Sequence, residues 1–121
     1  MQDPLNVYDV PPDPFLAWAK GSIRGHKKKG IKVEVTAEFL VELGKHSAYC
    51  PICGVPLAWD HVKSDCPSKP SLDRIDNEMI ITEDNIVIVC SRCNSTKSNR
   101  TMDNMLEWCK NFQRFAEDYV R

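Results

Sequence analysis

Hydrophobic residues recur at intervals of three and four along the last twenty residues, from Met102 to Arg121. This spacing predicts an amphipathic helix, and Thr101 just before it can cap the first turn. We interpret the helix as a core-packing element, but Trp108 and Phe115 widen its apolar stripe, so a homodimer interface is the alternative. The inward positions would be Met102, Met105, Leu106, Cys109, Phe112, Ala116, Tyr119 and Val120.

Two weaker helical patterns lie nearer the start of the chain. Residues Phe15 to Lys29 carry one apolar stripe, interrupted by two glycines that lower helix propensity. Residues Ala37 to Leu43 repeat the pattern, with Thr36 as the expected cap and Gly44 as the expected stop. Both segments therefore predict helices that place one face against a core.

The strand signals are shorter. Ile31 to Val35 alternates apolar and polar residues, which predicts a short strand. Ile86 to Val89 is a run of four β-branched residues, typical of a buried strand. The segment Ser71 to Asp76 precedes it, and a turn beginning at Asp76 and Asn77 would join the two in a hairpin. A polar run after Cys93 suits a short helix.

Composition adds the domain organisation. Four prolines among the first fourteen residues predict an extended arm over residues 1–14. The remaining 15–121 suits a single domain, because 121 residues with 42% hydrophobic and 27% charged residues are ordinary for one globular unit. The mixture of helices with a hairpin gives an α+β class.

Four of the six cysteines form two C-x-x-C pairs, Cys50 with Cys53 and Cys90 with Cys93. Two such turns typically offer four thiolates to one tetrahedral zinc ion. The start of the chain has no signal-peptide pattern, and its apolar runs are too short to span a membrane, so we expect a cytoplasmic protein. A reducing compartment favours zinc over disulfides.

The order of these motifs resembles the HNH family of endonucleases, also called ββα-metal or His-Me finger nucleases. The resemblance covers about two fifths of the chain, a core at 50–98, with flanking helices before it and at 102–121. It is closest to a phage and restriction-type subset, which implies a bacterial host cytoplasm if the protein is phage-encoded. The matching elements are Cys50-x-x-Cys53, Leu72-Asp73-Arg74-Ile75-Asp76, Asn85-Ile86 and Cys90-x-x-Cys93-Asn94-x-x-Lys97.

The resemblance implies a role for each motif residue. Asp73 and Asn94 would bind a catalytic divalent cation, and Asn85 would brace the loop. Their hard oxygen ligands suit Mg²⁺ or Mn²⁺, which leaves zinc a structural role. Arg74 takes the place of the family's usual base histidine, but an arginine cannot accept a proton near neutral pH. We expect it to bind a phosphate, with a structural ion pair to Asp76 or Asp60 as the alternative.

The residue that would act as the general base is therefore not identified by the resemblance. We rank His61 first, then His46, then Tyr49, with His26 as a further candidate. The alternative is that no protein base acts and a metal-bound or bulk water loses its proton directly.

Charge is clustered, although the net charge is only −1. Bases gather at the end of the first predicted helix, and a second acid-free basic segment follows the hairpin, which favours DNA as the partner. The expected phosphate contacts are Arg24, Lys27, Lys28, Lys29, Arg92, Lys97 and Arg100. A solvated basic face is the alternative.

These features lead to one main hypothesis. The protein would be a divalent-metal-dependent endonuclease that hydrolyses phosphodiester bonds in duplex or branched DNA, as a monomer or homodimer. A catalytically inactive zinc-containing nucleic-acid-binding module is the alternative, favoured by the arginine at 74. A protein-interaction subunit is a third, favoured by the mildly acidic balance.

Overall fold

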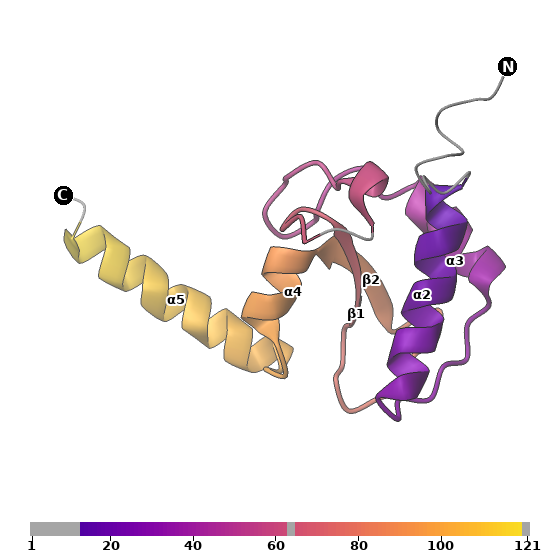
Figure 1. Cartoon of the computed structure of the whole chain (residues 1–121). Coiled ribbons are helices and arrows are strands. Elements are labelled where there is room, and N and C mark those ends of the chain that lie inside the picture. The colour runs from indigo at the N-terminus through magenta and orange to yellow at the C-terminus, as the bar shows by residue number, and fades with distance from the viewer. Residues whose placement is uncertain (1–12, 63–64, 120–121) are drawn as a thin grey trace, which may run out of the picture.

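The computed structural model describes residues 13–62 and 65–119 (Figure 1). Within them lie four α-helices and one antiparallel pair of strands, so the α+β class is confirmed. The elements are α2 (Pro14–Lys28), α3 (Ala37–Lys45), the 3-10 helix η1 (Trp59–His61), β1 (Pro70–Arg74), β2 (Ile86–Cys90), α4 (Ser91–Lys97) and α5 (Met102–Tyr119). The expected arm at 1–14 lies outside the described residues except for Asp13 and Pro14.

Side-chain caps begin both N-terminal helices, and the predicted Thr36 cap is confirmed. The Asp13 carboxylate accepts hydrogen bonds from the backbone N–H groups of Phe15 and Leu16 and so begins α2. Thr36 Oγ1 accepts from Phe39 N at 3.1 Å and begins α3. Each cap satisfies amide groups that the first helical turn leaves without an internal partner.

The hairpin pairs Pro70 with Cys90 and Arg74 with Ile86 at its two ends. Both strands bury most of their residues, and α4 follows β2 without a break. Figure 1 shows α4 on one side of the hairpin and α2 on the other. The predicted order of strand, strand and helix is therefore confirmed.

The core joins the hairpin to α2 and α3. Trp18, Leu40, Leu72, Ile81 and Val89 are all buried in one cluster. Burial of such side chains stabilises a domain by about 1.5–3 kcal/mol each. The cluster therefore fixes α2 firmly against the hairpin.

Gly44 is not the end of its helix, as predicted, but a buried residue within α3. A Cβ atom at this position would lie 2.9 Å from the Trp59 ring. Trp59 in turn packs against Phe15 and Trp18, with ring centroids 4.6 and 5.2 Å away. Gly44 is thus required for the close approach of Trp59 to the two helices.

The strand predicted at Ile31 to Val35 is also wrong. Only Val33 makes a bridge, in parallel orientation with Ile81. Glu34 N donates to the Ile81 carbonyl, and Ile81 N donates to the Lys32 carbonyl. The bridge and these two hydrogen bonds hold the connection against the loop that follows β1. The alternation therefore reflects one partly buried side rather than a strand.

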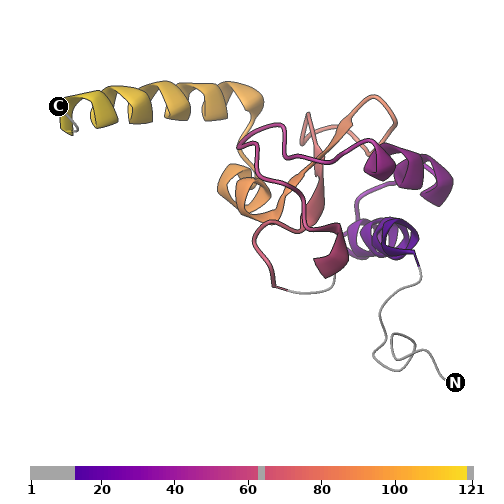
Figure 2. The same cartoon turned by 90° about the horizontal axis from the view of Figure 1, so that it is seen from above.

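Helix α5 does not pack into the core, which corrects the prediction. None of its described residues is buried, and both views show it projecting from the rest of the fold (Figures 1 and 2). Trp108 stacks on Phe112 along its exposed side, with centroids 5.4 Å apart, and Cys109 is exposed as well. Among the described residues, no helix combines the length and apolar character needed to cross a membrane.

Candidate metal centre and active site

The four paired cysteines meet in space, as predicted. Their sulfur atoms all lie within 4.8 Å of one another, and the Sγ atoms of Cys53 and Cys90 are 3.7 Å apart. A tetrahedral ion with zinc–sulfur bonds of about 2.3 Å places its sulfur ligands about 3.8 Å apart. The cluster is therefore close enough to coordinate a metal ion such as zinc.

Two local structures build the cluster. In the first, Gly54 at φ 79° closes a turn in which its N–H donates to the Cys50 carbonyl. In the second, Cys90 ends β2 and caps α4, and its sulfur accepts from Cys93 N at 3.4 Å. Cys90 N also donates to Cys50 Sγ at 3.3 Å and joins the two halves.

The ionisation of these thiols differs. Burial opposes ionisation of Cys50, but backbone N–H groups of Cys53, Cys90 and Ile52 outweigh it and lower the pKa to about 6. Burial raises the pKa of Cys90, and burial together with the neighbouring thiols raises that of Cys93. One thiolate is thus favoured without an ion, whereas further thiolates need a cation to offset their repulsion.

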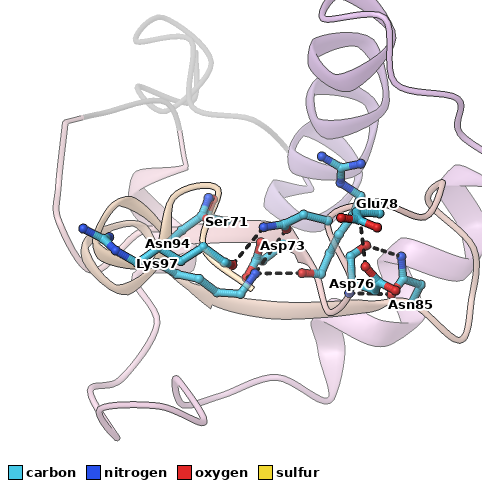
Figure 3. A network of polar contacts seen from close by, with 10 residues as sticks. Ser71, Asp73, Asp76, Glu78, Asn85, Asn94 and Lys97 are labelled. Carbon is cyan, nitrogen blue, oxygen red and sulfur yellow. Dashed lines mark hydrogen bonds and ion pairs between the residues drawn. The ribbon is translucent and has the colours of Figure 1, made fainter. Parts of the chain in front are cut away.

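A second polar cluster lies between β1 and α4 (Figure 3). Lys97 Nζ is 3.0 Å from Asp73 Oδ2, and the two side chains are only 5% and 9% exposed. Asn94 Nδ2 donates to Ser71 Oγ at 2.6 Å. Alternate residues of a strand share a face, as do residues three apart on a helix. These two contacts therefore hold one face of β1 against one face of α4.

Lys97 makes two further contacts from the same ammonium group. It donates to the Arg74 carbonyl at 3.0 Å and lies 3.3 Å from Asn77 Oδ1. The structure therefore corrects the expectation that Lys97 is a surface contact for DNA. Its charge is used inside the fold.

Asp73, Arg74 and Asn94 line one cavity of about 250 Å³. Another wall of this cavity is formed by His26 of α2 and by Lys29, the residue that follows this helix. The guanidinium of Arg74 donates to the Met79 carbonyl at 3.1 Å. Among the described residues it forms no ion pair with Asp76 or Asp60, the alternative considered from sequence.

Asn85 braces the loop that joins the two strands, as the resemblance implied (Figure 3). Its Oδ1 accepts from Asp76 N at 2.8 Å, and its Nδ2 donates to the carbonyls of Asp76 and Ile80 at 3.1 and 3.0 Å. Three bonds from one amide hold both ends of the turn after β1. They therefore fix the loop directly after Arg74, the last residue of β1.

No family model, curated protein or solved structure matches the chain. The likeness to HNH nucleases therefore depends on the motif residues themselves and on where the fold places them.

The structure does not bring the first-ranked base to the cavity. His61 lies in η1, where its Nε2 is 3.7 Å from Asp60 Oδ2, and it does not line the cavity. His46 at the end of α3 and Tyr49 beside the first cysteine pair are exposed and do not line it either. The residue placed there is His26, which sequence reasoning ranked below them. Its only sequence signal is the basic helix end in which it lies.

The remaining predicted DNA contacts divide between two regions. Lys27 and Lys28 are exposed at the end of α2, near Lys29, whereas Arg24 lines an adjoining hollow that shares His26 and Leu72 with the cavity. Arg92 lines a separate apolar hollow between α4 and α5. The exposed Arg100 follows α4, and its side chain donates to the Thr96 carbonyl.

Proposed function

We propose that the protein is a divalent-metal-dependent DNA endonuclease of the HNH type, with zinc in the four-cysteine cluster. The observation that carries this proposal is the shared cavity of Asp73, Asn94 and Arg74 beside α4. A carboxylate, an amide and a guanidinium in one cavity are suited to a hard cation and a phosphate together.

The two proposed ligands fit such an ion chemically. Asn94 donates its amide N–H to Ser71, which leaves the amide oxygen as its ligand atom. Asp73 pairs with Lys97 through Oδ2, and a carboxylate has a second oxygen. When bound, Mg²⁺ or Mn²⁺ would stabilise negative charge on the phosphate oxygens.

Arg74 contributes to substrate binding in this proposal. Its guanidinium can present two parallel N–H groups to a phosphate, and it keeps its charge at any physiological pH. The backbone of Arg74 is held by Lys97, which donates to its carbonyl. The side chain would therefore hold the phosphate beside Asp73 and stabilise its developing charge.

Relaxation of supercoiled plasmid tests the function. We expect nicking with added Mg²⁺ or Mn²⁺ and none without a divalent ion. Asn94→Ala, purified identically, should lose at least about 10²-fold in rate if its oxygen supports the transition state. A sample treated with EDTA should also be measured by circular dichroism. Removal of zinc would unfold the protein, and unfolding would also abolish nicking.

A second candidate function has one observation in its favour. Asp73 already pairs with the buried ammonium group of Lys97. The polar cluster could therefore serve only to stabilise the fold of a DNA-binding module. Equal nicking by the wild type and Asn94→Ala would show a contaminant, and no nicking by the wild type would leave this module as the better conclusion.

The cavity and the adjoining hollow suggest where the DNA backbone would lie. Together they place Arg24, Lys29 and Lys69 along one side of α2. A backbone that follows this side would contact successive phosphates with these cations. Each neutralised phosphate contributes about 0.9 to the slope of log affinity against log salt concentration.

We therefore expect Arg24→Ala/Lys29→Ala to weaken duplex binding and to reduce that slope by about two. Fluorescence anisotropy at several salt concentrations, without divalent ions, measures both quantities. The matched control is Lys32→Ala/Lys45→Ala, which removes two exposed cations that pair with Glu34 and Glu42. Equal slopes for the two double variants would contradict this DNA path.

A further inference from the structure

We propose that His26 of α2 is the base that activates water, an inference that rests on the nuclease function proposed above. Arg74 stands where the motif would otherwise carry a histidine, and it cannot accept a proton. His26 faces the same cavity as Arg74, Asp73 and Asn94. The fold would thus replace a base on β1 by one from a helix outside the hairpin.

The placement of His26 follows from how α2 packs. Trp18 Nε1 donates to the Pro70 carbonyl at 3.2 Å, which fixes α2 to the start of β1. From Trp18 to His26 a helix rises about 12 Å, and from Pro70 to Arg74 a strand extends about 13 Å. The hollow lined by Trp18 and Pro70 adjoins the cavity lined by His26 and Asp73, so the two elements run side by side in the same direction.

A hydrogen bond defines which nitrogen of His26 can act. Its Nδ1 lies 2.7 Å from the Ser22 carbonyl oxygen. A carbonyl only accepts, so Nδ1 carries the proton in this contact. In the neutral ring Nε2 then has a free lone pair, which is the requirement for a base. The helix therefore sets both the position and the tautomer of the imidazole.

The other histidines lack this combination. The chain has three histidines, and all three belong to the described residues. His46 has the same type of bond, from Nδ1 to the Glu42 carbonyl at 2.8 Å, but it follows α3 and does not line the cavity. His61 lies in η1 beside Asp60.

The proposed step is a hydrolysis. Nε2 of His26 takes a proton from water while the water oxygen forms a bond to phosphorus. The bond between phosphorus and the 3′-oxygen breaks, and that oxygen takes a proton from solvent. The products are a 5′-phosphate and a 3′-hydroxyl, and His26 then returns its proton to solvent.

The test compares His26 with His46, which make the same type of Nδ1 hydrogen bond, although only His26 lines the cavity. His26→Asn keeps a donor for the Ser22 carbonyl and lacks the base, and His26→Ala leaves space for added imidazole. We expect both to lower the single-turnover nicking rate by about 10²-fold or more, with duplex affinity within twofold of the wild type. His46→Asn and His46→Ala should nick at the wild-type rate, and imidazole should restore His26→Ala alone.

A nitrogen-detected NMR spectrum gives a readout independent of activity. Without divalent ions, the neutral His26 ring should show a proton on Nδ1 and none on Nε2, and the opposite tautomer would overturn the proposal. Undiminished nicking by His26→Ala would overturn it while leaving the nuclease function intact. Equal losses of rate and affinity would instead assign His26 to phosphate binding. A wild-type protein that does not nick would overturn both proposals.

Discussion

Cys90→Ser is expected to unfold the domain, and so is removal of zinc by a strong chelator. Cys90 ends β2, caps α4 and accepts a hydrogen bond from Cys93 N, so its loss would affect the hairpin, the helix and the proposed zinc site together. Structural zinc contributes about 10–16 kcal/mol in small zinc-binding peptides. A typical domain is stable by only about 5–15 kcal/mol. Circular dichroism and zinc content of the purified variant measure the effect.

Cys66→Ser and Cys109→Ser are the matched controls, because neither residue belongs to the cluster. We expect both to fold and to retain zinc at one ion per chain. A folded, zinc-free Cys90→Ser protein would contradict the structural role of the metal. Unfolding of all three serine variants would instead indicate a general dependence on thiols.

Asp73→Ala is expected to lose both nicking and stability. The substitution would remove a proposed metal ligand and leave the Lys97 ammonium buried next to no carboxylate. Loss of one partner of a buried ion pair costs about 3–5 kcal/mol. Chemical denaturation measures the free energy of unfolding, and plasmid relaxation measures the rate. A loss of activity in this variant alone would therefore not identify the ligand.

The double variant Asp73→Ala/Lys97→Met separates the two effects. Methionine fills much of the space of the lysine chain without its charge, so we expect most of the unfolding free energy to return. Nicking should remain absent, because the carboxylate is still missing. A double variant that recovers nicking would contradict the role of Asp73 as a ligand, and one that stays as unstable as Asp73→Ala would contradict the account of the ion pair.

The parts of the fold that could be predicted are those whose signals are local. The β-branched run from Ile86 to Val89 specifies a buried strand wherever it is placed. The predicted cap residues Thr36 and Thr101 begin α3 and α5 through their hydroxyls, whereas the Asp13 cap of α2 is not among the predictions. The spacing of the two C-x-x-C pairs likewise predicts one shared metal site, and the four sulfur atoms do lie close enough together for one ion.

The parts that could not be predicted depend on what lies opposite a residue. The apolar stripe of α5 shows that the helix is amphipathic, but periodicity does not say whether another element covers it. Lys97 has the same charge as Lys29, yet one is buried against Asp73 and the other is exposed. His26 reaches the cavity only because α2 packs along β1, and nothing in its neighbouring residues specifies that contact.

The span between the two cysteine pairs has a consequence for how the protein assembles. Cys53 and Cys90 are 37 positions apart, and closing a loop of that length costs about 3 kcal/mol in chain entropy. β1 lies inside this loop, and α4 begins where it closes. The four thiols therefore meet only when β1 and α4 are also brought together, so binding of a metal ion at the cluster would favour formation of the cavity lined by Asp73 and Asn94.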